Sequence, residues 1–124
     1  PPLYELFLKN DELHDPMINE DHAVSFGWAK AEHLSVMRDY SLQINTILRR
    51  VFSDAGLLLI DAKYEFGLFG DDVVLGDEIS PDSCRIWDAL THEPLDKDRF
   101  RQDMGGVVDS YAEIASRLGV DIPE

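Results

Sequence analysis

The chain has 124 residues, 29% of them charged, and a formal net charge of −14. This length suits one modest hydrophobic core, and an apolar content of 44% fits a globular fold rather than a disordered chain. The negative charge opposes binding to nucleic acid or to an anionic membrane, because its field repels phosphates.

Cysteine content and hydropathy indicate which kind of cellular setting the protein suits. Cys84 is the single cysteine, so no disulfide can form within the chain, and a cytoplasmic setting is expected. No apolar run approaches the roughly 20 residues that span a bilayer. The chain opens at Pro1 without an initiator methionine, from which we expect processing, an engineered start or a front part that is missing.

The first half of the chain is predicted to contain a strand, a long loop and a long helix. Residues 3–9 read as a mostly buried strand, and residues 10–27 are loop-like. From about residue 29 to a stop at Gly56, apolar residues recur at helical spacing and predict an amphipathic helix. Its buried stripe is expected to contain Leu34, Met37, Ile44, Leu48 and Val51.

The second half is predicted to begin with a hairpin and to end with a helix. Residues 57–69 form one expected strand, residues 70–72 a turn, and residues 73–77 its antiparallel partner. Residues 79–88 are expected as loop or short strand. A last helix over residues 96–118, broken at Gly105 and Gly106, should bury Tyr111, Ile114, Ala115 and Leu118. This order predicts an α+β fold, with a central antiparallel hairpin or sheet and flanking helices.

Charged residues alternate along the first hairpin strand. Asp61, Lys63 and Glu65 fall on every second position, so a strand directs them to one face, with residues 60, 62, 64 and 66 on the other. Asp77 and Glu78 add acids to the partner strand. One interpretation is a solvated face with salt bridges, each worth about 0–1 kcal/mol. Apolar flanks favour instead an interior hairpin, and Gly67 and Gly76 allow close approach of a ligand.

This charge pattern is typical of a site for a polyanion and a divalent cation. Two carboxylates on neighbouring strands commonly hold Mg²⁺ against nucleotide phosphates. Arg85 follows nearby, and its guanidinium can bind a phosphate through two hydrogen bonds; pairing with a surface acid is the alternative. The four histidines lack metal-ligand spacing, so no zinc site is expected. Cys84 is expected as a small buried residue, and Trp28 and Trp87 as core or interface aromatics.

Four segments together carry a family resemblance. Residues 7–20 (FLKNDELHDPMINE), 61–67 (DAKYEFG), 76–88 (GDEISPDSCRIWD) and 95–101 (LDKDRFR) resemble, in this order, the SAICAR synthetase (phosphoribosylaminoimidazole-succinocarboxamide synthase) family. The resemblance runs almost end to end. It assigns residues 1–124 to the C-terminal substrate- and nucleotide-binding portion of that family, without the N-terminal ATP-binding region and its glycine-rich loop.

The resemblance implies an ATP-dependent ligase of purine biosynthesis. In that family ATP activates the carboxylate of carboxyaminoimidazole ribonucleotide (CAIR), and the amine of L-aspartate then attacks to give SAICAR, ADP and phosphate. Such phosphoryl transfer depends on positioning and charge neutralisation rather than on a protein nucleophile. The implied cofactors are ATP and Mg²⁺. The implied partners are the small-molecule substrates, further copies of the chain and the missing N-terminal half.

The same resemblance implies roles for individual residues. Glu65 and Asp77 match acids that hold the nucleotide and its Mg²⁺, and Lys63 and Asp61 match catalytic positions lining the pocket. The implied binding residues are Lys9 for the cofactor and Arg85, Ser80, Asp82 and Asp15 for the substrate, with Arg85 on the ribonucleotide phosphate. Ala62 and Tyr64 depart from the bulky apolar residue and the leucine expected there, which affects core packing rather than chemistry.

Two further expectations follow from the missing half. The piece alone should lack synthetase activity, because the glycine-rich loop is absent from it. An isolated fragment should self-associate through apolar surface left uncovered by the missing half. Two other functions stay open on the residues alone: a Mg²⁺-dependent kinase-like phosphotransferase with another acceptor, and a non-catalytic acidic interaction module whose hairpin acids only aid solubility.

Overall fold

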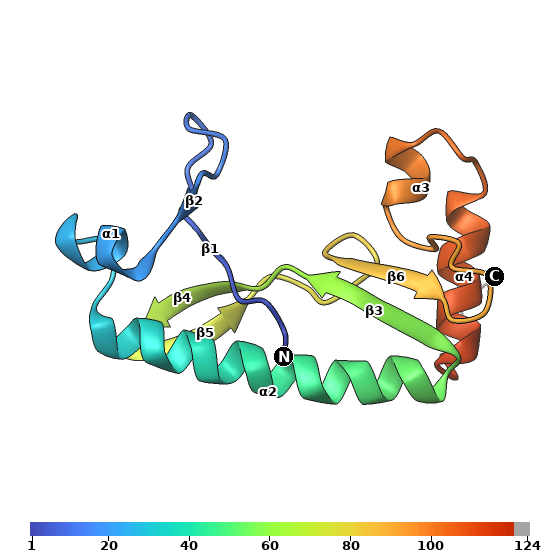
Figure 1. Ribbon diagram of the computed structural model, residues 1–124, viewed down its shortest axis with the longest axis horizontal. Helices are drawn as coiled ribbons and strands as arrows, with labels where there is room; N and C mark the ends of the chain where they lie inside the picture. The colour runs from blue at the N-terminus through green and yellow to red at the C-terminus, as the bar shows by residue number, and fades with distance from the viewer. Residues whose placement is uncertain (121–124) are drawn as a thin grey trace.

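The computed structural model describes residues 1–120, and it confirms the α+β class (Figure 1). The strands and helices are, in chain order, β1 (Leu6–Phe7), β2 (Met17–Ile18), α1 (Glu20–Ser25), α2 (Ala31–Asp54), β3 (Leu57–Ala62), β4 (Glu65–Phe69), β5 (Asp72–Gly76), β6 (Cys84–Asp88), α3 (Asp98–Arg101) and α4 (Val107–Arg117). The strands form three two-stranded antiparallel sheets, which are β1–β2, β3–β6 and β4–β5. In Figure 1, α2 runs along one side of the strands, with α1 at one end and α3 and α4 at the other.

The long helix α2 confirms the expectation from residue spacing. It ends where Gly56, with φ of 74°, takes the left-handed conformation that glycine adopts without strain. Leu34 and Phe52 are buried on its inner side. Val51 is 44% exposed, so its expected place in the buried stripe is wrong. Phe52 takes that place, because it lies four residues, about one turn, after Leu48.

A small core lies where α2, β3, β6 and α4 meet. It consists of Phe52, Leu57, Cys84, Ile86, Leu95 and Ile114. Leu57 of β3 and Ile86 of β6 are each only 1% exposed, so this strand pair contributes the two most buried side chains of the core. Cys84 belongs to this core and is buried, which confirms its expected role as a small packing residue.

The predicted single strand over residues 57–69 is wrong, because the chain divides it between two sheets. The register of β3 against β6 shifts between Leu59 and Asp61, which makes a bulge that bends the strand. Ile60 lies at this bulge and is 43% exposed, so it does not face the core as expected. After Ala62 the chain leaves the β3–β6 pair, and β4 begins at Glu65 in the next sheet.

The hairpin β4–β5 confirms the predicted antiparallel pairing. Glu65 lies opposite Gly76 and Phe69 opposite Asp72, with Gly70 in the left-handed conformation at the turn. Phe66 contacts α2 by stacking on Tyr40 at 6.5 Å between ring centroids. The hairpin is not interior within residues 1–120, however, because large apolar side chains of both strands are exposed: Leu68, Phe69, Val74 and Leu75.

The N-terminal region differs from the predicted buried strand and long loop. The strand is reduced to the two residues of β1, of which Phe7 is exposed. The segment expected as loop contains β2 and α1. Asn19 starts α1 because its side chain accepts the His22 N–H at 2.8 Å, while His22 Nδ1 accepts the Asn19 N–H at 3.2 Å.

The C-terminal helical region has the predicted break. Gly105 and Gly106 have φ of 72° and 64° and separate α3 from α4. Ile114 is buried, and Tyr111, Ala115 and Leu118 are half-buried, so the expected inner side of α4 is confirmed. No helix within residues 1–120 has the combination of length and apolarity needed to cross a membrane.

Candidate functional site

The junction between β3 and β4 carries the charged row predicted from the sequence. Asp61 lies near the end of β3, Lys63 lies between the two strands, and Glu65 begins β4. The Lys63 N–H donates to the Ser83 carbonyl at 2.8 Å. This bond ties the junction to the loop that leads into β6, so the row and the Ser80–Arg85 region form one continuous surface.

At one end of the row, Glu65 pairs with a lysine from the N-terminal segment. Lys9 Nζ lies 2.8 Å from a Glu65 carboxylate oxygen. This hydrogen bond and the Glu65 charge raise the pKa of Lys9, and Asp77 contributes to the same rise. Asp77 follows Gly76, which pairs with Glu65 across the hairpin, so the sequence-predicted cofactor residues Lys9, Glu65 and Asp77 lie at the same end of it.

Asp77 has an unusual backbone conformation directly after β5. Its φ is 58°, which is uncommon for residues other than glycine but tolerated by Asp. Its side chain accepts the N–H of Glu78 at 2.8 Å. A Cβ placed on the preceding Gly76 would lie 3.7 Å from the Glu65 carbonyl oxygen, whereas one placed on Gly67 would meet no atom within 4 Å. Of the two glycines, only Gly76 therefore lies against another backbone segment.

Asp15 approaches the middle of the row from the β1–β2 loop. Its carboxylate lies 3.9 Å from Lys63 Nζ, too far for a direct hydrogen bond. The other carboxylate oxygen accepts the Asn10 N–H at 2.8 Å, and the Asp15 φ of 49° closes this loop. The two predicted residues are thus neighbours, held loosely at their charged ends.

At the other end of the row, two carboxylates hold Arg85. Its Nη1 donates to Asp61 at 2.8 Å, and its Nε lies 3.0 Å from Asp98. The charges of Asp61 and then of Asp98 raise the pKa of Arg85. Asp98 also accepts from Arg101 at 2.8 Å. The structure thus pairs the guanidinium with acids, which is the alternative that the sequence offered, and leaves the side chain 50% exposed; its binding of a phosphate stays a prediction.

The loop before Arg85 is held by its own hydroxyl groups and by α4. Ser80 Oγ accepts the Asp82 N–H at 3.1 Å, and Ser83 Oγ accepts the Ser80 N–H at 3.1 Å. Tyr111 of α4 donates to the Asp82 carboxylate at 2.6 Å. Burial and this hydrogen bond raise the pKa of Tyr111 above its ordinary value. The loop is thus fixed, and its Asp82 carboxylate is already engaged.

The carboxylates of the site suit Mg²⁺ only if a nucleotide and water supply the other ligands of the ion. Within the part of the chain that the structure describes, no three His, Cys, Asp or Glu side chains gather closely enough to hold a metal ion by themselves. Glu65 begins β4, and Asp77 directly follows Gly76, the residue of β5 that pairs with Glu65. Mg²⁺ commonly binds to one or two carboxylates while phosphates and water supply its other ligands, so these two residues fit that ion beside a nucleotide.

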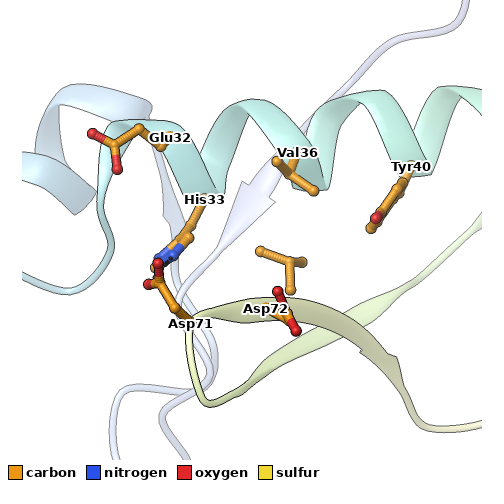
Figure 2. Close-up of a pocket in the computed structure, with 7 residues that line it drawn as sticks. Glu32, His33, Val36, Tyr40, Asp71 and Asp72 are labelled. Atoms are coloured by element: carbon orange, nitrogen blue, oxygen red, sulfur yellow. Dashed lines mark hydrogen bonds and ion pairs between the residues drawn. The ribbon is translucent and has the colours of Figure 1, made fainter.

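A shallow pocket of about 350 Å³ lies elsewhere, between α2 and the turn of the β4–β5 hairpin (Figure 2). Its lining is formed by Glu32, His33, Val36, Tyr40, Asp71, Asp72 and Val73. The buried His33 imidazole lies 3.0 Å from the Asp71 carboxylate and connects helix to turn. The pocket contains no site residue predicted from the sequence, and its polar pair has a structural explanation.

Asp98 contacts Arg85 and Tyr111 contacts Asp82, while Asp96 accepts the Ile86 and Asp98 N–H groups beside them; none of the three was singled out as a site residue from the sequence. Asp96 and Asp98 lie at the start of the C-terminal helical region, and Tyr111 lies in α4. Asp-x-Asp before a helix is a capping signal, so local pattern could place the two acids at a helix start. It could not show that this helix start lies against Arg85.

Comparison with known proteins gives consistent matches. The family model described as SAICAR synthetase matches residues 1–118. The phosphoribosylaminoimidazole-succinocarboxamide synthase of Coxiella burnetii is 66% identical over 122 residues, covering 98% of this chain and 51% of the relative. That of Idiomarina loihiensis is 57% identical over 122 residues, covering 98% and 52%. The chain thus spans about half the length of the curated relatives it matches.

Solved structures agree with the sequence relatives. The crystal structure of the synthase from Ehrlichia chaffeensis matches with a TM-score of 0.93 and 46% identity, over 100% of this chain and 54% of that one. A SAICAR synthetase in complex with ADP matches with a TM-score of 0.94 and 46% identity, over 100% and 53%. Both structures share the fold of the described residues.

Proposed function

The chain belongs to the SAICAR synthetase family, and we propose that it forms the C-terminal part of an ATP-dependent ligase. The reaction joins L-aspartate to CAIR and yields SAICAR, ADP and phosphate. The observation that carries the proposal is the continuous charged row from Lys9 to Arg85, in a chain 66% identical to a named synthase. This combination favours the synthetase over a phosphotransferase with another acceptor and over a non-catalytic acidic module.

The nucleotide end of the proposed site is the group of Lys9, Glu65 and Asp77. The two carboxylates would hold Mg²⁺, which neutralises phosphate charge when a nucleotide is bound. Lys9, whose side chain is largely exposed, would then contact phosphate oxygens as well as Glu65. The ADP held by one of the matched synthetases supports a nucleotide in this family.

The substrate end is the loop from Ser80 to Arg85, with Asp15 facing it across Lys63. Arg85 would bind the phosphate of the ribonucleotide, because its planar guanidinium matches phosphate geometry. Ser80 and Asp82 fix the loop that presents Arg85. Asp15 would orient polar groups of the substrate from the β1–β2 loop.

Lys63 and Asp61 lie between the two ends, where the reacting groups would meet. A carboxylate oxygen of CAIR attacks the terminal phosphorus of ATP and releases ADP, giving an acyl phosphate. The aspartate amine then attacks the acyl carbon, phosphate leaves with the bridging oxygen, and the amine loses a proton. Lys63 would balance the negative charge of these steps, and Asp61 would orient Lys63 and Arg85.

Because the chain spans about half of its relatives, we propose that the other half of the family polypeptide supplies the glycine-rich ATP loop. The purified 124-residue chain should therefore form no ADP that depends on CAIR and aspartate. Adding the missing half should restore this activity. ADP formation by the 124-residue chain alone would contradict the division of the site.

Two substitutions in the complete protein test the nucleotide end. Glu65→Gln and Asp77→Asn should abolish binding of Mg²⁺–ATP, measured by titration calorimetry, without changing the circular dichroism spectrum. Glu78→Gln is a matched control, since Glu78 is an exposed acid directly beside Asp77. If ligase activity survives both changes at full rate, the site assignment is wrong.

A further inference from the structure

Asp96 is the most buried charged residue of the described chain, and the proposed chemistry gives it no role. It is only 1% exposed. One of its carboxylate oxygens accepts the Ile86 N–H at 2.6 Å, and the other accepts the Asp98 N–H at 2.8 Å. We propose that Asp96 is a positioning residue, which holds Asp98 against Arg85 and so fixes the guanidinium that binds the substrate phosphate. This inference rests on the proposed function of Arg85.

The positions of the two N–H donors in the chain explain how Asp96 acts. Ile86 directly follows Arg85 in β6, and Asp98 is the first residue of α3. A single carboxylate therefore connects the backbone beside the arginine to the backbone of its partner acid. Movement of α3 relative to β6 would stretch one of the two bonds, so the separation of Asp98 and Arg85 is set by Asp96.

The fixed contacts determine which donors remain for a ligand. An arginine carries five N–H groups. Asp61 accepts one N–H of Nη1, and the Asp98 carboxylate forms an ion pair with the guanidinium, 3.0 Å from Nε. The two N–H groups of Nη2 and the second one of Nη1 take no part in these two contacts. The guanidinium keeps one orientation only while Asp98 stays in place, and a fixed planar guanidinium favours the geometry of a phosphate.

The chemistry of the bridge requires a carboxylate rather than an amide. Burial raises the pKa of Asp96, whereas its two backbone hydrogen bonds and the charge of Arg85 oppose this rise. An asparagine has nearly the same volume but one acceptor oxygen, so it would present an N–H₂ group to one of the two backbone donors. Asp96→Asn therefore breaks one bond of the bridge without leaving a cavity.

The first experiment measures kinetics in the complete protein for Asp96→Asn and Asp98→Asn. Each should raise the KM for CAIR and the inhibition constant of ribose 5-phosphate about tenfold, a loss typical of one charged hydrogen bond. The KM for ATP should stay within about twofold. If Asp96→Asn does not fold, Asp98→Asn still tests the proposal, because Asp98 is only part-buried and its substitution disturbs the core less.

A matched control separates a positioning role of Asp96 from a general contribution to stability. Asp88 also accepts two backbone N–H groups, those of Leu90 and Thr91, and binds Arg117 at 2.8 Å. It makes no hydrogen bond or ion pair with Arg85, Asp61 or Asp98. Asp88→Asn should lower the thermal midpoint and leave the KM for CAIR unchanged. If Asp96→Asn behaves in the same way, Asp96 is merely structural and the proposal is overturned.

Arg85→Lys completes the test. If it leaves the KM for CAIR unchanged, the proposed phosphate site itself is wrong; if it raises that KM and Asp96→Asn does not, only the positioning role fails. A role through Arg85 requires that Asp96→Asn adds no further loss in the Arg85→Lys background. The NMR signal of the Arg85 Nε–H gives a readout free of activity. It should be sharp in the unmodified protein and broadened in Asp96→Asn, and an unchanged signal would overturn the proposal.

Discussion

The hydroxyl group of Tyr64 is buried without a hydrogen-bond partner in the described chain, so removing it should stabilise the protein. Tyr64 lies between β3 and β4, at a position where the family resemblance predicts leucine. A buried hydroxyl without a partner costs roughly 1–3 kcal/mol in protein mutational series. Tyr64→Phe keeps the ring and removes this cost. We therefore expect the free energy of unfolding to rise by about 1 kcal/mol.

This gain is measurable as a shift of the thermal midpoint. Unfolding a chain of 124 residues has an entropy of about 0.26 kcal/mol/K near its midpoint, so 1 kcal/mol corresponds to about 4 °C. Tyr40→Phe is the control, because its side chain is 42% exposed and water solvates its hydroxyl. Its effect should stay within about 0.5 kcal/mol.

The pH dependence gives a second, independent measurement. Burial, and next the charge of Cys84, raise the pKa of Tyr64 from 10.0 to about 12. Between these two values the unfolded chain ionises Tyr64 and the folded chain does not, so the unmodified protein loses stability as the pH rises. The advantage of Tyr64→Phe should therefore grow from pH 10 to pH 12 in urea unfolding. A lowered midpoint, or an advantage that is constant with pH, would refute the reasoning.

Three other predictions follow from the core, an ion pair and the apolar surface. Ile86→Ala should lower the unfolding free energy by about 2–5 kcal/mol in urea titration, because it opens a cavity in the core, whereas Ala at the exposed Val108 should cost less than about 0.5 kcal/mol; equal effects would contradict the core assignment. The hydrogen bond from Thr91 and then that from Arg117 lower the pKa of Asp88 below its ordinary 3.8, so stability from Asp88 is present above pH 3.8 and is lost as the pH falls through the lower folded value. The difference between the unmodified protein and Asp88→Asn should shrink as the pH falls below 3.8, and a difference that persists in strong acid would rule this out. The isolated chain should self-associate in light scattering through exposed side chains such as Phe69, which is 79% exposed, and a monomer throughout the micromolar range would count against this.

The parts of the fold that depend on local pattern were predictable from the sequence. The spacing of apolar residues gives α2, and Gly56 gives its end. The break at Gly105 and Gly106 is similarly local, because both take φ values that favour glycine. Helix α1 was missed although its signal is present: Asn19 and His22 form a capping box, but a six-residue helix has no apolar periodicity.

The division between β3 and β4 could not be predicted from alternation alone. Asp61, Lys63 and Glu65 keep a period of two through the junction, while the chain bulges at Ile60 and leaves its sheet. Which sheet a strand joins depends on contacts distant in sequence. The ion pairs of Arg85 also depend on contacts distant in sequence, since Asp61 lies 24 residues before it and Asp98 lies 13 residues after it. Residue type and motif indicated Arg85 itself, but not the acids that hold it.

Helix α2 packs against both β3 and β5, which belong to different sheets. With 24 residues it is about 36 Å long, so it supports both strand pairs and fixes their relative position. The spacing between the carboxylates of Glu65 and Asp77 and the guanidinium of Arg85 is thus a property of a helix that carries none of them. A change that bends α2 would therefore alter the distance between the two ends of the site, although every side chain in the site stays the same.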